Sequence, residues 1–142
     1  ALDINCKFSG NKSIYVDSSA KKNPGPCGAG IFSDDLIEGK TTKVALALGH
    51  GSNNIGELTA LGHACNLIIG QARQLPNDKR KFLILSDSCY AISDSCYAIG
   101  IATSWYKIKQ NKKLCHRLVS LYRLATKTAS VNLHPVPAHV QV

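Results

Sequence analysis

The alternation of apolar and polar residues predicts three strands in the first third of the chain. Ser13–Val16, Cys27–Ser33 and Lys43–Leu48 are each short and rich in β-forming residues, and a Pro/Gly-rich turn separates the first two. The polar segments Asp34-Asp35 and Glu38-Gly39-Lys40 fall between the second and third runs. We therefore expect an antiparallel meander in this region.

The next segment has the three- and four-residue spacing of an amphipathic helix. Helix signals begin at Asn53-Asn54, where Asn is a favourable N-cap, and they end at Leu75–Asp78. After this helix, Lys81–Leu85 is a compact apolar run that predicts a buried strand leading into Ser86-Asp87. The apolar face of the helix is expected to consist of Leu58, Leu61, Cys65, Ile68 and Ala72.

The last third predicts one further helix and one further strand. Trp105–Lys113 reads as a basic connector, and Val131–Leu133 has the character of a final strand. Between them, Arg117 and Arg123 lie off an apolar stripe formed by Leu114, Leu118, Leu121, Tyr122 and Ala125. The expected element order is β-β-β-α-β-α-α-β, which corresponds to a mixed sheet with helices packed on it.

A tandem repeat occupies the region of the first of the two consecutive helices in this order. Ser86–Ile92 reads SDSCYAI, and Ser93–Ile99 repeats the same seven residues. Two copies are too few for a coiled coil. Seven residues add almost two whole turns to a helix, so we interpret the repeat as a local extension of one helix. A copying artefact is the alternative.

Length and charge narrow the class of protein. The 142 residues, 44% of them hydrophobic, indicate a single domain over residues 1–142, and no segment has the length of a membrane span or the order of a signal peptide. All nine acidic residues occur at or before Asp94, whereas the 48 residues from Ser95 to Val142 contain seven Lys or Arg and no carboxylate. Such a one-signed half favours a polyanionic partner over a basic surface that is merely solvated.

The six cysteines predict reduced thiols rather than a disulfide framework or a zinc site. They stand at positions 6, 27, 65, 89, 96 and 115, with no CxxC pair among them. Several fall on apolar patterns, where a free Cys behaves as a small hydrophobe. We therefore expect an intracellular protein in a reducing compartment, the nucleus or the cytoplasm.

Three carboxylates occupy similar places in the predicted elements. Asp17 ends the first strand, Glu57 lies in the first turn of a helix, and Asp87 ends the strand before the repeat. Any one of them alone is more often a cap or a surface residue. Three at one sheet edge would repel one another unless cations neutralised them, and Mg²⁺ is a hard ion that prefers carboxylate oxygens. Two such ions roughly 3.5–4 Å apart can activate a water and stabilise a leaving oxygen.

The segments around these carboxylates resemble the motifs of type I ribonuclease H. The first motif is matched by Tyr15–Ser19, Asn23–Pro26 and Gly28–Gly30, the second by Asn53–Leu58, and the third by Leu85–Tyr90. Their order also matches, and the resemblance runs from about Ile14 to His139. It implies an α/β (mixed α+β) ribonuclease H-like fold with a five-stranded mixed sheet and helices on its faces.

The resemblance also implies roles for individual residues. Asp17, Glu57 and Asp87 would be the catalytic metal ligands for two Mg²⁺ ions, with Mn²⁺ as a substitute, and the segment Val136–His139 would carry a catalytic histidine, His139. The residues implied to hold the substrate, the RNA·DNA hybrid, are Asn23, Asn54 and Ser88. A monomer without a small-molecule cofactor is expected. The wide minor groove of a near-A-form hybrid displays 2′-hydroxyls, which polar turn residues can select without reading sequence.

The basic connector is a further candidate contact with nucleic acid. Lys107, Lys109, Lys112 and Lys113 are placed to contact phosphates of the DNA strand, and a solvated connector is the alternative. About eight residues separate Trp105 from Leu114, so this chain has at most a short version of the basic protrusion that some family members carry.

The sequence departs from the family pattern at three points. Ser18 replaces the Gly that normally follows the first Asp. The repeat leaves Asp87 and Asp94 as candidates for the third ligand; we choose Asp87 because the strand leads directly into it, although counting back from Trp105 favours Asp94. No Asp or Glu follows Asp94, so the family's fourth carboxylate is missing and we expect a C-terminal truncation or a degenerate domain.

The leading hypothesis is a hybrid-specific endonuclease whose cleavage, in these 142 residues, is weak or absent. The alternative is a catalytically impaired nucleic-acid-binding domain on the same fold, from a free protein or from a retroelement reverse transcriptase polyprotein. A structural domain with an incidental acidic cluster is the least favoured hypothesis.

Overall fold

The computed structural model describes residues 10–20, 25–86, 97–104 and 107–135. Its strands are β1 (Lys12–Ala20), β2 (Gly25–Ile37), β3 (Lys40–Gly51), β4 (Lys81–Ser86) and β5 (Ser130–Pro135). Its helices are α2 (Asn53–Ala72), α3 (Tyr97–Ala102) and α4 (Lys112–Thr128), with a 3-10 helix at Asn77–Lys79. This order confirms the sequence of elements predicted above.

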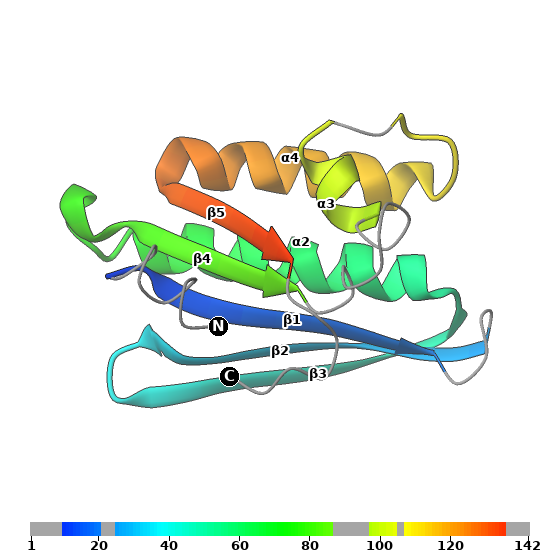
Figure 1. Cartoon of the computed structure of the whole chain (residues 1–142), viewed down its shortest axis with the longest axis horizontal. Helices are drawn as coiled ribbons and strands as arrows, with labels where there is room; N and C mark the ends of the chain where they lie inside the picture. Colours follow the sequence, from blue (N-terminus) through cyan, green and yellow to red (C-terminus); the bar gives the residue numbers. More distant parts are fainter. Residues whose placement is uncertain (1–9, 21–24, 87–96, 105–106, 136–142) are drawn as a thin grey trace.

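The five strands form one mixed sheet in the order β3-β2-β1-β4-β5 (Figure 1). β2 pairs antiparallel with both β1 and β3, which is the predicted meander. β4 pairs parallel with both β1 and β5. In the parallel part, Val16 of β1 pairs with Ser86 of β4. The predicted fold class, a five-stranded mixed sheet with helices packed on it, is therefore confirmed.

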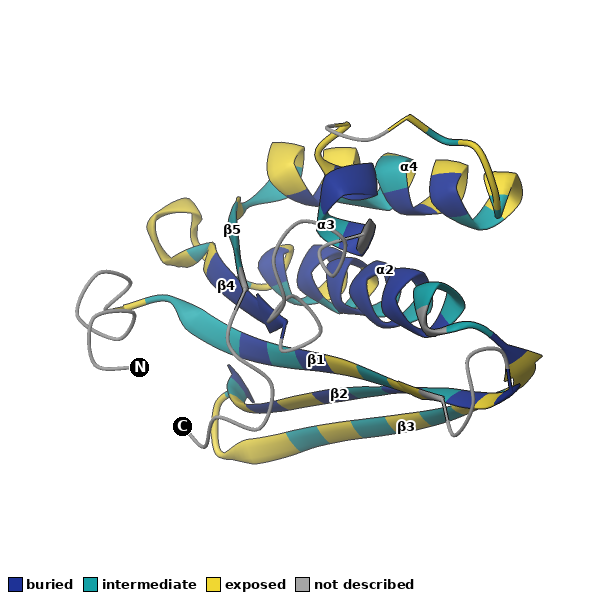
Figure 2. Cartoon of the chain, turned by 45° about the vertical axis from the view of Figure 1, so that its right-hand side comes forward, coloured by how far each residue is buried: buried dark blue, intermediate teal, exposed yellow. Residues whose placement is uncertain are grey.

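The main core lies between one face of the sheet and the helices (Figure 2). Ile14 and Val16 of β1 and Phe82 and Ile84 of β4 supply the sheet side of this core. All five residues predicted for the apolar face of α2 are buried, and so are Ala60, Ala64 and Ile69 on its flanks. The wider buried surface arises because α2 packs against both the sheet and α4.

The contact between α2 and α4 places Gly62 of one helix beside two leucines of the other. A Cβ atom on Gly62 of α2 would lie 3.7 Å from Leu121 and 3.9 Å from Leu118, which is ordinary van der Waals contact. The predicted stripe of α4 faces this contact, with Leu118 and Ala125 fully buried, while Arg117 and Arg123 are exposed as expected. Cys115 is also fully buried.

Arg80 connects the far ends of these two helices. Its Nε donates a hydrogen bond to the carbonyl oxygen of Leu75 at 2.8 Å, and Nη1 donates to that of Thr128 at 3.5 Å. Its own carbonyl oxygen accepts the N–H of Ser130, the first residue of β5, at 2.8 Å. One side chain and its peptide thus satisfy carbonyl and amide groups that helix and strand ends leave open.

Three local predictions were wrong. Asp34-Asp35 lie within β2 rather than in the turn, because the strand continues through a bulge between Ser33 and Ile37. Asp35 Oδ1 accepts hydrogen bonds from the backbone N–H of Ser13 and from Ser33 Oγ, which holds the bulge against β1. The helix N-cap is Ser52 rather than an Asn, and Ser52 makes no side-chain cap hydrogen bond.

The third correction concerns Glu57, which was expected in the first turn of its helix. Because α2 begins at Asn53, Glu57 is the fifth helical residue and stands at the start of the second turn. The interpretation of the repeat as a helix extension concerns residues 87–96, which lie outside the described residues. Of the second copy, only the last three residues belong to α3.

Candidate active site

Asp17 lies on β1, next to the point where the parallel pairing with β4 reaches Val16 and Ser86. Its side chain is exposed, and Oδ1 accepts a hydrogen bond from the backbone N–H of Ser18 at 2.7 Å. This bond orients the carboxylate but leaves most of its oxygen lone pairs available to another ligand.

Glu57 approaches the same region from α2. It is 9% exposed, which is unusual for a carboxylate, and its Oε2 atom is shielded from solvent. Asn54 precedes it by three residues, so the two side chains share one side of the helix. Asn54 is partly buried.

A close backbone contact brings the two carboxylates together. A Cβ atom on Gly56 would lie 2.7 Å from Ser18 Cβ and 2.9 Å from the carbonyl oxygen of Gly28, so only Gly fits here without a shift. Ser18 follows Asp17 and Glu57 follows Gly56, so this contact sets the separation of the two acidic residues. Ser18, which replaces the Gly of the family motif, thus has a second role as the surface against which α2 packs.

A small pocket contains both acidic side chains. Its lining combines the carboxylates and one hydroxyl with apolar residues of the core: Val16, Asp17, Glu57, Ala60, Leu61, Ser86, Ala98 and Ile99. Two carboxylates in one pocket with apolar walls repel each other, and a bound cation would offset that repulsion. The available donors are all oxygens, which is the donor set that a hard divalent ion prefers.

Asp87, the predicted third ligand, lies outside the described residues, as does its rival Asp94. The described part of β4 ends at Ser86, which lines the pocket and immediately precedes Asp87 in the sequence. Among the described residues, no group of three or more His, Cys, Asp or Glu side chains could hold a metal ion. Asn23, Ser88 and His139 also lie outside the described residues.

A broad, shallow groove begins at Asp17 and crosses the open face of β1, β2 and β3. Sequence reasoning missed this feature. Its signal was the run of small residues at every second position, Gly28 and Gly30 in β2 and Ala45 and Ala47 in β3. Gly28 cannot be enlarged freely, because a Cβ atom there would lie 3.0 Å from the carbonyl oxygen of Leu46. The groove is lined by Asp17, Ser18, Ser19, Pro26, Cys27, Gly28, Ala29, Gly30, Ala45, Leu46 and Ala47.

The three cysteines in the described part of the chain do not line the small pocket. Cys27, Cys65 and Cys115 are buried free thiols, and burial raises the pKa of Cys65 to about 12. A thiol held protonated in this way is a poor nucleophile and a poor metal ligand. In the described part of the chain, no helix is long and apolar enough to cross a membrane.

Comparison with known proteins places the chain in a family. The family model described as RNase H matches residues 10–142, and no curated protein sequence matches. Among solved structures, LC11-RNase H1 in complex with an RNA/DNA hybrid is 21% identical and superposes with a TM-score of 0.64, covering 88% of this chain and 84% of that one. The same enzyme, isolated from compost by a metagenomic approach, gives a TM-score of 0.64 in a second structure at 21% identity, covering 90% and 85% of the two chains.

A third structural neighbour comes from an archaeon. RNase H1 from the halophile Halobacterium salinarum NRC-1 is 19% identical, with a TM-score of 0.60 and coverage of 89% of this chain and 86% of that one. At these identities the structural likeness establishes the shared fold, and the family model establishes descent. The chain belongs to the ribonuclease H family.

Proposed function

We propose that this domain, residues 1–142, hydrolyses the RNA strand of RNA·DNA hybrids with two divalent metal ions, Mg²⁺ or Mn²⁺. The observation that carries the proposal is the pocket shared by Asp17, Glu57 and Ser86, the residue directly before Asp87. Family membership supports the same reaction, and one structural neighbour was solved with an RNA/DNA hybrid bound.

Asp17, Glu57 and Asp87 would hold the ions, with Asp17 shared between them. When bound, the ions supply an activated water and stabilisation of the leaving oxygen. The protein's own contribution is to keep the carboxylates in place before the substrate arrives, and the contact of Gly56 with Ser18 does this for the first two. His139 is proposed to assist product release or proton movement beside this site.

The substrate is proposed to lie over the groove of small residues that begins at Asp17. Gly28, Gly30, Ala45 and Ala47 have no long side chains, so a sugar–phosphate backbone can approach the sheet closely. Asn54, on the same side of α2 as Glu57, and Asn23 and Ser88 are proposed to contact the hybrid. Lys107, Lys109, Lys112 and Lys113 are all exposed, which suits contacts with phosphates of the DNA strand.

The second candidate is a catalytically impaired binding domain on the same fold, including one from a retroelement polyprotein. The observation that favours it is the absence of any Asp or Glu after Asp94 in these 142 residues, because a two-metal site normally uses a fourth carboxylate here by resemblance to the family. We expect cleavage by this exact chain to be weak for the same reason.

One assay separates the two candidates. The chain, and a version extended by its native downstream residues, are incubated with labelled hybrid, duplex DNA and duplex RNA, with Mg²⁺ or with EDTA. Metal-dependent cleavage of the hybrid alone supports the nuclease, and hybrid binding by both versions without cleavage supports the binding domain. If the chain shows no binding and no cleavage of the hybrid, both candidates are contradicted.

The same assay identifies the third ligand. Asp87→Asn and Asp94→Asn are compared in whichever version cleaves. We expect the Asp87→Asn variant to lose cleavage and the Asp94→Asn variant to keep it. Full activity of the Asp87→Asn variant would refute the assignment of Asp87.

A further inference from the structure

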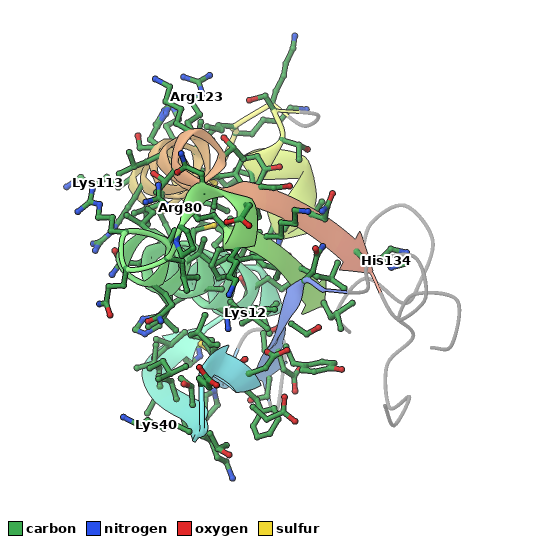
Figure 3. The ribbon with its side chains drawn as sticks, turned by 90° about the vertical axis from the view of Figure 1, so that its left-hand side faces the viewer. Lys12, Lys40, Arg80, Lys113, Arg123 and His134 are labelled. Atoms are coloured by element: carbon green, nitrogen blue, oxygen red, sulfur yellow. The ribbon has the colours of Figure 1, made fainter. Side chains whose placement is uncertain are left out.

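The outward side of α4 carries a row of positive charge. Lys113, Arg117, Arg123 and Lys127 are all exposed, and we call them the α4 basic face. Their spacing of four to six residues places them on the side of the helix opposite Leu118 and Ala125, which are buried against α2 and the sheet. Figure 3 shows Lys113 and Arg123 projecting away from the strands into solvent.

Among the described residues of the helical layer, no exposed carboxylate offsets this row. α4 contains no Asp or Glu, and the only one in α2 is Glu57, which is buried at the other site. The other described acidic residues lie on the strands, on the β2–β3 turn, or at Asp78 in the 3-10 helix. A solvated surface helix ordinarily mixes both signs of charge, so the one-signed face calls for an anionic partner.

A groove between α2 and α4 runs beside this row. It has a volume of about 200 Å³, and Arg117 reaches it from the α4 basic face while Thr59, His63 and Asn66 border it from α2. These polar side chains provide hydrogen-bond donors at the bottom of a positively charged surface. A phosphate backbone needs this combination of neutralising charge and neutral donors.

The length of the α4 basic face favours nucleic acid over other anions. From Lys113 to Lys127 the helix rises about 21 Å, at 1.5 Å per residue, a span that corresponds to about six phosphates along one duplex strand. A membrane surface is disfavoured because the apolar side of α4, which would have to insert, is already packed against α2.

We propose that the α4 basic face and the adjoining groove bind the phosphate backbone of a nucleic-acid segment outside the catalytic pocket. The surface lies on the side of the helices away from the sheet, whereas the groove at Asp17 lies on the open face of the sheet. Apart from Lys113, which is also proposed to contact the hybrid, the α4 basic face therefore engages a different segment. This second contact does not require cleavage, so it can be tested independently of the proposed catalytic activity.

The test measures binding of a labelled 40-base-pair DNA duplex by fluorescence anisotropy in EDTA, across a range of salt concentrations. The triple variant Arg117→Gln, Arg123→Gln and Lys127→Gln removes three charges while keeping residues that form helices well. We expect its affinity at low salt to fall about tenfold or more, and the slope of log K against log salt to decrease by about two to three. A matched control, Lys40→Gln with Lys43→Gln on the exposed edge of β3, should bind like the unmodified chain.

Two further measurements make the result decisive. The variant Arg117→Lys with Arg123→Lys keeps the charges and should keep the binding, and thermal melting should show that all variants remain folded. Unchanged DNA binding by the triple variant would overturn the proposal, and so would an equal loss in the β3 control. Competition by polyglutamate as effective as that by DNA would assign the surface to acidic proteins instead and would also overturn it.

Discussion

Gly56 of α2 and Ser18 of β1 are in contact: a Cβ atom on Gly56 would lie only 2.7 Å from Ser18 Cβ. The backbone of the helix therefore packs directly against a side chain of the strand, and no space remains for a methyl group. The two neighbouring residues, Asp17 and Glu57, take their positions from this contact. The geometry of the pocket thus rests on a residue that has no functional group.

Substitution Gly56→Ala should destabilise the protein. The added methyl group must displace Ser18 or the carbonyl oxygen of Gly28, and overpacking of this kind costs about 1–3 kcal/mol. Gly70→Ala is the matched control, because Gly70 lies in the same helix, is exposed and has nothing within 4 Å of the added atom. That control should gain up to about 1 kcal/mol of helix stability. Urea unfolding measures both, and equal or greater stability of Gly56→Ala would show that the contact imposes no constraint.

Substitution Glu57→Gln should separate activity from stability. Removing one buried negative charge beside Asp17 relieves repulsion, so we expect the melting temperature to stay the same or rise. Hybrid cleavage, measured in the version extended by its native downstream residues, should fall about 100-fold or more, because a lost metal contact costs several kcal/mol of transition-state stabilisation. Asp78→Asn, an exposed carboxylate outside the pocket, is the control and should change neither quantity. Retained cleavage in Glu57→Gln would remove this residue from the proposed mechanism.

Asp35 and Asp34 are adjacent, yet they should respond differently to substitution. Asp35 accepts a hydrogen bond from the Ser13 amide at 3.0 Å, so Asp35→Ala leaves this part-buried amide without its acceptor, whereas Ser33 Oγ can still donate to the Ser13 carbonyl oxygen at 2.7 Å. We expect a loss of about 1–3 kcal/mol. The exposed neighbour gives the control, since Asp34→Ala should stay within about 0.5 kcal/mol of the unmodified protein. Equal effects of the two substitutions in chemical denaturation would contradict the assignment of Asp35 to the bulge.

The buried thiol of Cys65 should make the protein sensitive to alkali. Burial raises the pKa of Cys65 from 9.0 to about 12, so between these values the folded protein holds a proton that the unfolded chain releases. Stability from this group is complete below about pH 9 and is lost as the pH rises toward 12. Unfolding measured from pH 8 to pH 11 should show this decline, and Cys65→Ala should show a shallower one after allowance for its lower starting stability. Parallel curves for the two proteins would exclude Cys65 as the cause.

The order of elements and the main faces of the core could be predicted because they depend on local periodicity. Leu58, Leu61, Cys65, Ile68 and Ala72 recur at helical spacing, and all five are buried. The continuation of β2 through Asp34 and Asp35 could not be predicted in this way. It depends on a hydrogen bond that Asp35 accepts from the amide of Ser13, more than twenty positions earlier, and charged residues side by side ordinarily indicate a turn.

The candidate site was predictable in part. Asp17 and Glu57 were expected near each other from their places in the elements, and they share a pocket. The contact of Gly56 with Ser18 and the groove of small residues depend on pairing between strands and packing of a helix across them, and a single sequence shows neither directly. Asp87, Asn23, Ser88 and His139 remain predictions.

At the end of the molecule away from the pocket, Arg80 links the opening of three segments through its hydrogen bonds. Its side chain donates hydrogen bonds to the carbonyl oxygens of Leu75, beyond α2, and of Thr128, at the end of α4. Its own carbonyl oxygen accepts a hydrogen bond from the N–H of Ser130, the first residue of β5. Opening any one of these three segments breaks a bond to the same residue, and this shared partner links their opening. Their amide hydrogens are therefore expected to exchange with solvent as one cooperative unit, at a common free energy of opening.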